Sequence, residues 1–369
     1  MRSEFLVIFL MFFVVSCTAA LPCRVINDND KIVEGKLAAE LDAALTQSHI
    51  NGDFDGVVMM KRGQETLLKR AYGCANRSTN KLNSLSVISD IGSIAKSFTA
   101  VAIMQLHAQN KLSIDDTIDH YFPSVPADKK IITIRQLLTH TSGLPNYHSR
   151  GDFDAMTRTQ GEQKVLSLSL RYPPGEDSGY SNAGYMLLGA IVERVSRTDF
   201  QSHVSNNILK PLGLNSTAWY GSNKIDFDDI ALGSVGNRTG ATTYDTPVTW
   251  ALLAGGGMVS NIDDLTVWYD ALLNKQLFSE ELNKTILAPN DYDRTLAGLR
   301  KRLVENQPAL EIGGSTDFGY TAKIQYFQDA DIMVVLLFNG YSPSYGPSTH
   351  HVISNRVMAN VIRQYEYNP

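Results

Sequence analysis

Strand-forming segments lie near both ends of this 369-residue chain, and a mainly helical stretch separates them. Toward the N-terminus, residues 57–60 and 65–71 are predicted to form two strands joined by a tight turn. Toward the C-terminus, residues 320–327 and 332–338 are predicted to form a hairpin. The simplest assembly is an α/β (α+β) fold in which the two ends share one antiparallel sheet and the middle forms a helical lobe.

Helices are predicted on both sides of this organisation. The spacing of apolar residues indicates helices over residues 30–50 and 352–363. In the middle of the chain, three capping boxes each predict the start of a helix, and they begin at Thr133, Thr198 and Ser260.

The expected lobes differ in how they are built from the chain. The sheet lobe takes about residues 31–92 and 296–369, and the helical lobe takes about residues 93–295. A cleft between two such lobes is a common place for a binding or catalytic site.

The N-terminus has the pattern of a targeting segment. Arg2 precedes an apolar run at residues 5–15, which is shorter than the roughly 20 residues that span a bilayer. We predict a signal peptide over residues 1–20, which leaves residues 21–369 as the folded domain of a secreted or periplasmic protein. The alternative is a bacterial lipoprotein box that ends at Cys17, which would anchor the chain to a membrane through a lipid.

Composition excludes several classes of function. The chain is 43% hydrophobic and 19% charged, as globular proteins are, and its formal net charge of -5 comes with no clustered basic face for nucleic acid. No spacing of cysteines or histidines resembles a metal site. Cys23 and Cys74 could pair in an oxidising compartment, provided that the fold brings their Cα atoms close enough.

Ser93 and Lys96 stand three residues apart at the start of a predicted helix that runs from near Gly92 to Asn110. Residues at this spacing share one helix face, so the lysine amine can reach the serine oxygen. A serine must be activated before it acts as a nucleophile. Burial and the positive end of a helix both lower the pKa of a lysine, which favours a neutral amine that can accept the serine proton.

A second motif, Tyr180-Ser181-Asn182, follows the rigid Tyr-Pro-Pro-Gly turn at residues 172–175. A tyrosine hydroxyl close to Lys96 could relay the proton to a leaving group, and Asn182 could donate to the substrate and orient the lysine. The alternative is structural: a tyrosine anchored in the core and an asparagine that caps a helix. Both roles can hold together.

The two motifs resemble the active-site set of the serine β-lactamase and penicillin-binding protein superfamily. The tyrosine in the second motif resembles class C β-lactamases and their esterase and D-aminopeptidase relatives. The resemblance covers about residues 35–365 and implies a β-lactamase-like fold. Further stretches match in type and order, at residues 137–145, 173–175, 185–189 and 255–260.

The resemblance implies a role for each motif residue. Ser93 would be the acylated nucleophile, and Lys96 and Tyr180 would be the general acid/base pair. The Ser93 N–H would be one oxyanion donor, and the other would come from the strand near residue 314 or 315. No cofactor or metal is required. The substrate-binding residues implied are Asn182, Gly313, Gly314 and Ser315. His140 lies in the matching stretch at residues 137–145, and we expect it to be a packing and capping residue and not a catalyst.

The third motif of the family, Lys-Thr-Gly or His-x-Gly, is changed in this chain. Residues 311–319 read Glu-Ile-Gly-Gly-Ser-Thr-Asp-Phe-Gly, and Glu311, Ile312 or Gly313 could stand where the family has its cation. In the family this cation helps to hold a substrate carboxylate. Its loss disfavours β-lactam and D-Ala-D-Ala chemistry and favours an esterase-like hydrolase.

Three hypotheses follow. The leading one is an exported serine hydrolase that acts on a small-molecule or peptide ester or amide through a Ser93 acyl-enzyme. The second is a D,D-carboxypeptidase or weak β-lactamase in which Arg300, Lys301 or Arg302 supplies the missing cation. The third is a non-catalytic binding module that keeps the fold.

Overall fold

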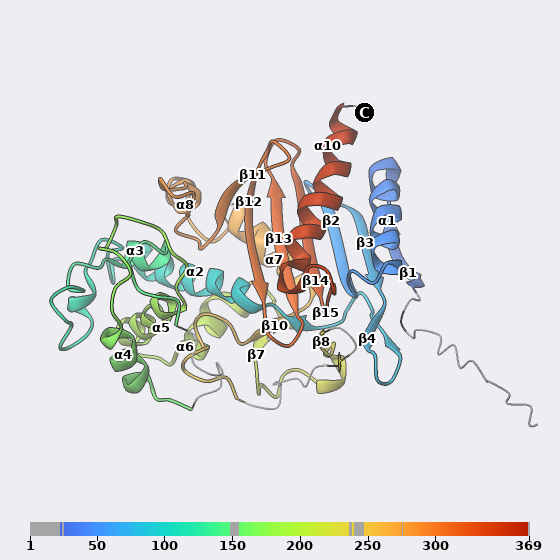
Figure 1. The fold of residues 1–369 in the computed structure, drawn as a ribbon. Helices are drawn as coiled ribbons and strands as arrows, with labels where there is room; N and C mark the ends of the chain where they lie inside the picture. The colour runs from blue at the N-terminus through green and yellow to red at the C-terminus, as the bar shows by residue number, and fades with distance from the viewer. Residues whose placement is uncertain are drawn as a thin grey trace, which may run out of the picture.

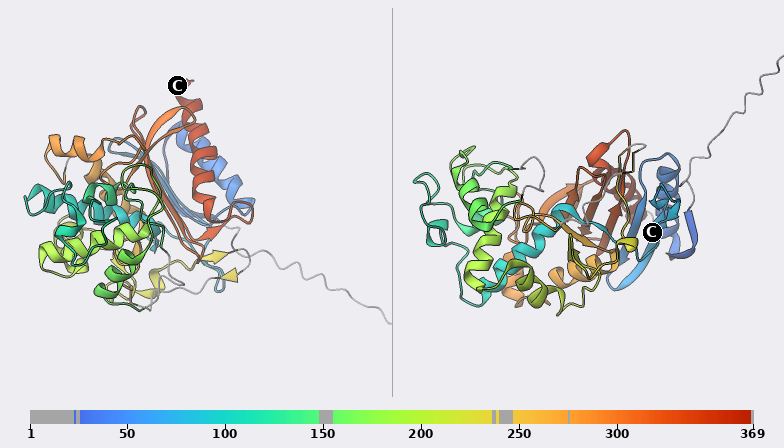
Figure 2. Two further views of the ribbon diagram at one scale, coloured as in Figure 1. Left: turned by 60° about the vertical axis from the view of Figure 1, so that its left-hand side comes forward. Right: turned by 90° about the horizontal axis from the view of Figure 1, so that it is seen from below.

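The structure is a computed structural model, and it describes residues 23, 26–147, 155–235, 238–239, 247–274 and 276–367. One antiparallel sheet stands at the centre of the molecule (Figure 1). A pair of helices from the two chain ends covers one face of the sheet, and the helical lobe lies on the other side (Figure 2).

The sheet has seven strands, and the two chain ends meet at its centre. Strand β2 from the N-terminal part pairs antiparallel with β14 from the C-terminal part, with Val57 opposite Leu337. The prediction that both ends share one antiparallel sheet is confirmed. In spatial order the strands are β1 (Ile26–Val33), β3 (Glu65–Tyr72), β2 (Gly56–Arg62), β14 (Ile332–Phe338), β13 (Thr321–Phe327), β12 (Gln307–Ser315) and β11 (Arg300–Val304).

Helices from both ends of the chain cover the outer face of the sheet. Helix α1 (Gly35–Ile50) buries Leu37, Leu41 and Leu45 against it. At the other end of the chain, α9 (Thr349–Val352), a π-helical segment (Ile353–Met358) and α10 (Ala359–Tyr367) follow one another and pack beside α1.

The predicted start of the first helix at residue 30 is wrong. Residues 26–33 form the edge strand β1 instead, although their sequence is rich in Asn and Asp. They pair with β3, with Val33 opposite Leu68. Backbone hydrogen bonds to an existing sheet edge stabilise this strand, and local composition does not reveal that partner.

The helical lobe packs around α2 (Ala95–Ala108), whose side chains are largely buried. The ring of Phe98 stacks on that of Trp268 with 4.1 Å between the centroids, which ties α2 to α7. The other α-helices of this lobe are α3 (Ile134–Leu138), α4 (Arg158–Ser167), α5 (Asn182–Ser196), α6 (Phe200–Val204), α7 (Ile262–Leu273) and α8 (Glu280–Leu287). Single turns of 3₁₀- or π-helix lie at Ile118–His120, Ser205–Leu209, Phe227–Asp229 and Gly346–Ser348.

Short strands form smaller sheets outside the central one. They are β4 (Cys74–Asn76) with β5 (Lys81–Leu82), β6 (Ser89–Asp90) with β10 (Met258–Ser260) and β7 (Ala218–Trp219), and β15 (Gly340–Tyr341) with β8 (Ser234–Val235) and β9 (Arg238–Thr239).

One of the three predicted capping boxes forms as expected. The Thr133 side chain accepts a hydrogen bond from the Gln136 N–H, and the Gln136 side chain accepts one from the Thr133 N–H. The other two predictions were one residue early, because Asp199 and Asn261 are the N-caps of α6 and α7. Their short side chains accept the backbone N–H three residues on, as Asp and Asn do at many helix starts.

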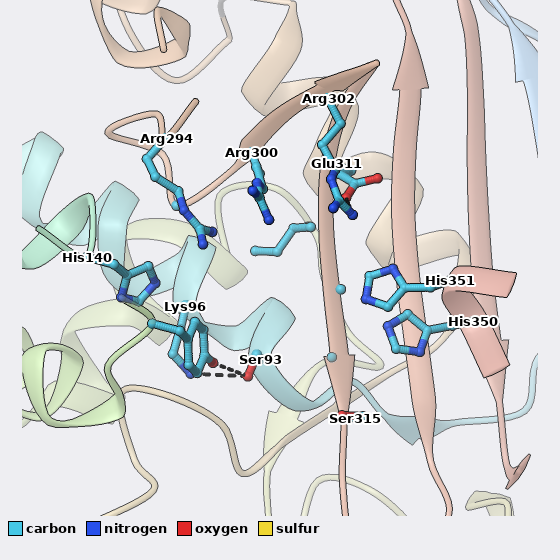
Figure 3. A pocket seen from close by; sticks show the side chains of 15 residues that line it. Ser93, Lys96, His140, Arg294, Arg300, Arg302, Glu311, Ser315, His350 and His351 are labelled. Atoms are coloured by element: carbon cyan, nitrogen blue, oxygen red, sulfur yellow. Dashed lines mark hydrogen bonds and ion pairs between the residues drawn. The ribbon is translucent and has the colours of Figure 1, made fainter. Parts of the chain in front are cut away.

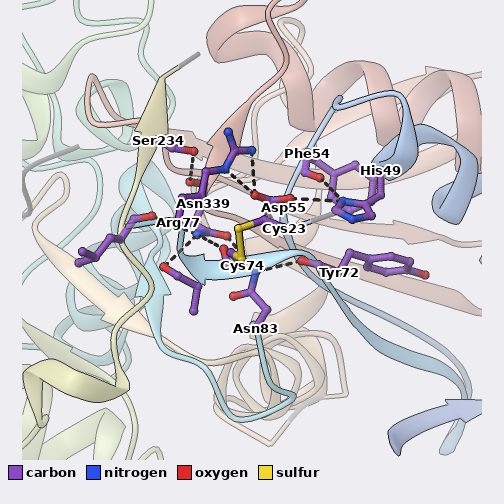
Figure 4. Close-up of polar contacts among 12 residues, drawn as sticks. Cys23, His49, Phe54, Asp55, Tyr72, Cys74, Arg77, Asn83, Ser234 and Asn339 are labelled. Atoms are coloured by element: carbon purple, nitrogen blue, oxygen red, sulfur yellow. Dashed lines mark hydrogen bonds and ion pairs between the residues drawn. A yellow bond between two sulfur atoms is a disulfide. The ribbon is translucent and has the colours of Figure 1, made fainter. Parts of the chain in front are cut away.

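Cys23 and Cys74 form a disulfide with 5.1 Å between their Cα atoms, so the pairing that the sequence left open is present. Figure 4 shows the polar groups around it. The Asn339 side chain donates to the Cys74 carbonyl oxygen at 2.9 Å, and Asp55 pairs nearby with Arg77 at 2.8 Å. The disulfide therefore ties residue 23 to the end of the central sheet.

The predicted signal peptide and Cys17 lie outside the described residues. Within the described part of the chain, no helix is long and apolar enough to cross a membrane.

Removal of the disulfide is expected to destabilise the protein. The two cysteines are 51 residues apart, and in the loop-entropy account a cross-link of this span contributes about 4 kcal/mol to the free energy of unfolding. We expect the double variant Cys23→Ala/Cys74→Ala to lose about 3 to 4 kcal/mol in urea denaturation. The wild type in reductant should show the same loss, and equal unfolding midpoints with and without reductant would contradict this expectation.

Candidate active site

The turn that carries Ser93 joins the short strand β6 to helix α2. A single 3₁₀ turn (Gly92–Ile94) precedes the α-helix, so the predicted helix start near Gly92 holds with a tighter first turn. Gly92 has a φ of +49°, a backbone conformation that glycine adopts without strain. Its N–H donates to the buried Asp90 carboxylate at 2.7 Å, which fixes the turn before the serine.

Ser93, Lys96 and Tyr180 come together as the sequence predicts (Figure 3). The Ser93 Oγ lies 2.5 Å from the Tyr180 hydroxyl oxygen and accepts a hydrogen bond from Lys96 Nζ at 3.2 Å. Lys96 is 2% exposed, and its Nζ also donates to the Gly255 carbonyl at 2.6 Å. Two groups that can exchange a proton with the serine oxygen are therefore within hydrogen-bond reach of it.

His140 supports the loop that presents Tyr180. Its φ is +58°, its Nδ1 accepts the Ser181 N–H at 3.2 Å, and its ring centroid lies 4.7 Å from that of Tyr180. Burial, together with the charges of Arg294 and Lys96, lowers the pKa of His140 well below its ordinary value, so this ring is neutral. These contacts agree with the packing role expected for His140.

Asn182 is the first residue of α5, and the cap of that helix is Ser181, whose hydroxyl accepts the Gly184 N–H. The suggestion that Asn182 is the cap is therefore wrong. A Cβ at Gly255 would lie 3.6 Å from Asn182 Oδ1 and 3.3 Å from Lys96 Nζ. The Asn182 Oδ1 and the Lys96 Nζ thus both lie next to Gly255.

The end of β12 lies against the Ser93 turn. A Cβ at Gly314 would come within 2.2 Å of the Ile91 carbonyl oxygen and 2.7 Å of the Ser93 nitrogen, so only glycine fits there. The Thr316 N–H donates to the Tyr320 carbonyl, on the edge of β12 that faces β13. Because successive N–H groups of a strand point to opposite edges, the Ser315 N–H points toward the Ser93 turn. The N–H groups of Ser93 and Ser315 are thus the two candidate oxyanion donors.

Alternation along β12 decides which residue replaces the cation of the third motif. Gly314 faces the Ser93 turn, so Ile312, two residues earlier, faces the same way and packs in the core between the sheet and the helical lobe. Glu311 points to the other face, where its carboxylate meets Lys323 at 2.9 Å. The apolar side chain of Ile312 therefore occupies the place of the family's Lys or His.

A cleft of about 330 Å³ opens beside Ser93. Its lining includes Ser93, Lys96, Tyr180, His140, Gly313, Gly314 and Ser315, together with Arg294, Arg300, Arg302, His350 and His351. Sequence reasoning missed Arg294, His350 and His351, which carry no motif and reach the cleft only through the tertiary fold. Asn182 is not part of this lining.

Two arginines make the cleft positive although the motif's cation is missing. The backbones of Arg294 and Arg300 form a β-bridge, and within the described residues neither guanidinium has a carboxylate partner. Burial, and then the neighbouring Arg300 charge, lower the pKa of Arg294. Arg302 differs, because it meets the Glu311 carboxylate at 3.4 Å. Of the three cations proposed from sequence, Arg300 and Arg302 line the cleft and Lys301 does not.

In the described ranges, no three His, Cys, Asp or Glu residues are placed to hold a metal ion.

The sequence matches the family described as Beta-lactamase over residues 36–356. The chain belongs to the Beta-lactamase family. The matched region contains every site residue named above, and it covers the helical lobe and every strand of the central sheet except the edge strand β1. This membership agrees with the resemblance seen in the two motifs, and the chain carries the catalytic groups of a serine hydrolase of the β-lactamase-related type.

Individual relatives are distant. Protein flp of Staphylococcus aureus (strain N315) is 27% identical over 294 residues, which are 72% of this chain and 55% of flp. Penicillin-binding protein 4* of Bacillus subtilis (strain 168) is 31% identical over 174 residues, which are 45% of this chain and 38% of that protein. The chain thus spans about half the length, or less, of the curated relatives it matches.

A solved structure shows the same fold. The D-amino acid amidase from Ochrobactrum anthropi SV3, crystallised with L-phenylalanine amide, superposes with a TM-score of 0.78 at 19% identity. The superposition covers 90% of this chain and all of the amidase chain. The β-lactamase-like fold expected from the motifs is confirmed.

Removal of the Tyr180 hydroxyl should slow acylation of Ser93. We expect Tyr180→Phe to lower the rate at which a fluorophosphonate labels Ser93 by roughly 10²- to 10⁴-fold, because general acid–base groups contribute about this much. Intact-mass spectrometry at timed intervals measures the rate. The matched control is Tyr172→Phe, since the Tyr172 hydroxyl donates to the His140 carbonyl at 3.2 Å and Tyr172 does not line the cleft. Equal labelling rates in the two variants would exclude a proton-transfer role for Tyr180.

Proposed function

We propose that the protein is an exported serine hydrolase that cleaves an ester or amide through an acyl-enzyme on Ser93, and that its substrate carries an anionic group. One observation carries the first part: the Ser93 oxygen lies within hydrogen-bond distance of both Lys96 Nζ and the Tyr180 hydroxyl. The family and the two oxyanion donors support the same chemistry.

The reaction follows from this geometry. Ser93 Oγ attacks the substrate carbonyl while Tyr180 or Lys96 takes its proton, and the carbonyl oxygen becomes an oxyanion held by the N–H groups of Ser93 and Ser315. Tyr180 then returns the proton to the leaving alcohol or amine as the bond to it breaks. Water, deprotonated by the same pair, attacks the acyl-enzyme and releases the acid.

The anionic substrate is inferred from Arg294 and Arg300. Both guanidinium groups line the cleft, and in the described residues neither has an ion-pair partner, because the Glu311 carboxylate of the same cleft pairs with Lys323 and Arg302. Two adjacent unpaired positive charges can bind a carboxylate. The loss of the motif's cation therefore does not leave the cleft without positive charge. The missing cation was the main reason to expect a substrate without a carboxylate, and the two arginines remove that reason. The proposal of ester or amide cleavage does not depend on it.

Export is supported by two features that do not depend on each other. One is the predicted signal segment at residues 1–20, and the other is the Cys23–Cys74 disulfide, a bond that persists in oxidising compartments.

A second candidate is a D,D-carboxypeptidase or weak β-lactamase. Both substrate types carry a carboxylate close to the bond that is cleaved, which Arg294 and Arg300 could bind. Penicillin-binding protein 4* and the D-amino acid amidase are named for related ligands and activities, at low identity to this chain. A chromogenic cephalosporin and a peptide ending in D-Ala-D-Ala separate this candidate from a simple esterase.

The decisive experiment is detection of the acyl-enzyme. Wild type and Ser93→Ala are incubated with small esters, β-lactams and D-aminoacyl peptides, and their intact masses are recorded. We expect mass adducts on the wild type only. Adducts on both proteins would overturn the role of Ser93, and no turnover of any compound would favour a non-catalytic binding module.

Arg300 is expected to select anionic substrates. We expect Arg300→Met to lower kcat/KM for mono-4-nitrophenyl succinate by roughly 10- to 100-fold, the cost of one lost charge-assisted hydrogen bond. The neutral 4-nitrophenyl butyrate should change less than threefold. Lys301→Met is the matched control, because Lys301 is the next residue on the same strand and lies outside the cleft. A similar loss for both esters would contradict anion selection.

A further inference from the structure

The cleft extends across β12 at Gly313. Figure 3 shows Arg294 and Arg300 on the Ser93 side of this strand, and His350 and His351 on its other side. A Cβ at Gly313 would lie 3.0 Å from His350 Nε2, so the absence of a side chain at this residue keeps the passage open. A bound substrate can therefore touch groups on both sides of the strand.

His351 presents one defined nitrogen to this part of the cleft. Lys323 Nζ lies 3.1 Å from His351 Nδ1. An ammonium group has no lone pair, so it can only donate, and Nδ1 must accept. In a neutral imidazole the other nitrogen then carries the hydrogen, which makes Nε2–H a donor.

A buried ion pair keeps Lys323 charged. Its Nζ meets the Glu311 carboxylate at 2.9 Å, and the same carboxylate accepts from Gln325 at 2.9 Å. Burial opposes ionisation of Glu311, but Lys323 and Arg302 nevertheless hold its pKa below the ordinary value. Burial lowers the pKa of Lys323 and the Glu311 carboxylate opposes that shift, so the amine is charged and donates to His351 when the pH is below the lysine pKa.

His351 itself stays neutral. Burial, and then the charge of Lys323, lower the pKa of His351 to about 4. In the described part of the chain, no group accepts a hydrogen bond from its Nε2–H. The side chain lines the cleft, so this donor is available to a ligand.

We propose that His351 Nε2–H binds a second oxygen acceptor of the substrate, across β12 from the anionic group that Arg294 and Arg300 hold. The ligand class is a small molecule with two oxygen-bearing groups, of which at least one is an anion. The inference rests on the anionic substrate of the proposed function, and it is independent of acyl transfer.

Binding to an enzyme that cannot turn over tests this proposal. In the Ser93→Ala background, calorimetry compares succinate with butyrate, which has the same chain length and one carboxylate fewer. We expect succinate to bind more tightly than butyrate. His351→Phe should reduce the ratio of the succinate affinity to the butyrate affinity roughly tenfold. His351→Gln keeps an N–H donor and should restore most of the ratio. His120→Phe, an exposed histidine outside the cleft, should leave it unchanged.

Two outcomes would overturn the second subsite. One is equal binding of succinate and butyrate to Ser93→Ala, and the other is a ratio that His351→Phe does not change. Neither outcome touches the acyl-enzyme experiment, so failure of this subsite and failure of the proposed hydrolysis remain distinguishable.

The tautomer can be read without any change to His351. We expect ¹⁵N NMR of the Ser93→Ala protein at neutral pH to show His351 with hydrogen on Nε2 only, and Lys323→Met to abolish this preference. Hydrogen on Nδ1 in the parent protein would overturn the proposal even if His351→Phe fails to fold.

Discussion

The contact between the end of β12 and the Ser93 turn joins the two lobes into one site. It is a backbone-to-backbone contact, because Gly314 lies against Ile91 and Ser93 with no room for a side chain. One oxyanion donor, the Ser93 N–H, belongs to the helical lobe, and the other, the Ser315 N–H, belongs to the sheet. The spacing between them is therefore set by how closely these backbones approach, and a side chain at residue 314 would separate the donors.

The parts of the site that local geometry determines could be predicted from the sequence. Ser93 and Lys96 share a helix face at any position in a fold, and the Tyr180 motif has a recognisable sequence around it. The central strands were also predictable, because β2 and β14 are short apolar segments between turns. The edge strand β1 was not, since its stability comes from pairing with β3 and its own residues are polar.

The residues that tertiary packing brings in could not be predicted. Arg294 reaches the cleft through a bridge to Arg300, and His351 comes from the start of the C-terminal helix. The third motif was ambiguous for a similar reason. Sequence alone does not say which face of β12 a residue takes, and a shift by one residue exchanges Ile312 with Glu311. Only the contact at Gly314 fixes that register.

The central pairing of β2 with β14 also has a consequence for the order of assembly. Val57 lies opposite Leu337, so about three quarters of the chain separates the two strands at the middle of the sheet. Closing so long a loop costs conformational entropy before the contacts between the paired strands offset that cost. The helical lobe lies between these strands in sequence, and its core is shared with the inner face of the sheet. The Ser93 turn precedes β12 in the chain, so the cleft is completed only when the strands that follow the helical lobe join the sheet.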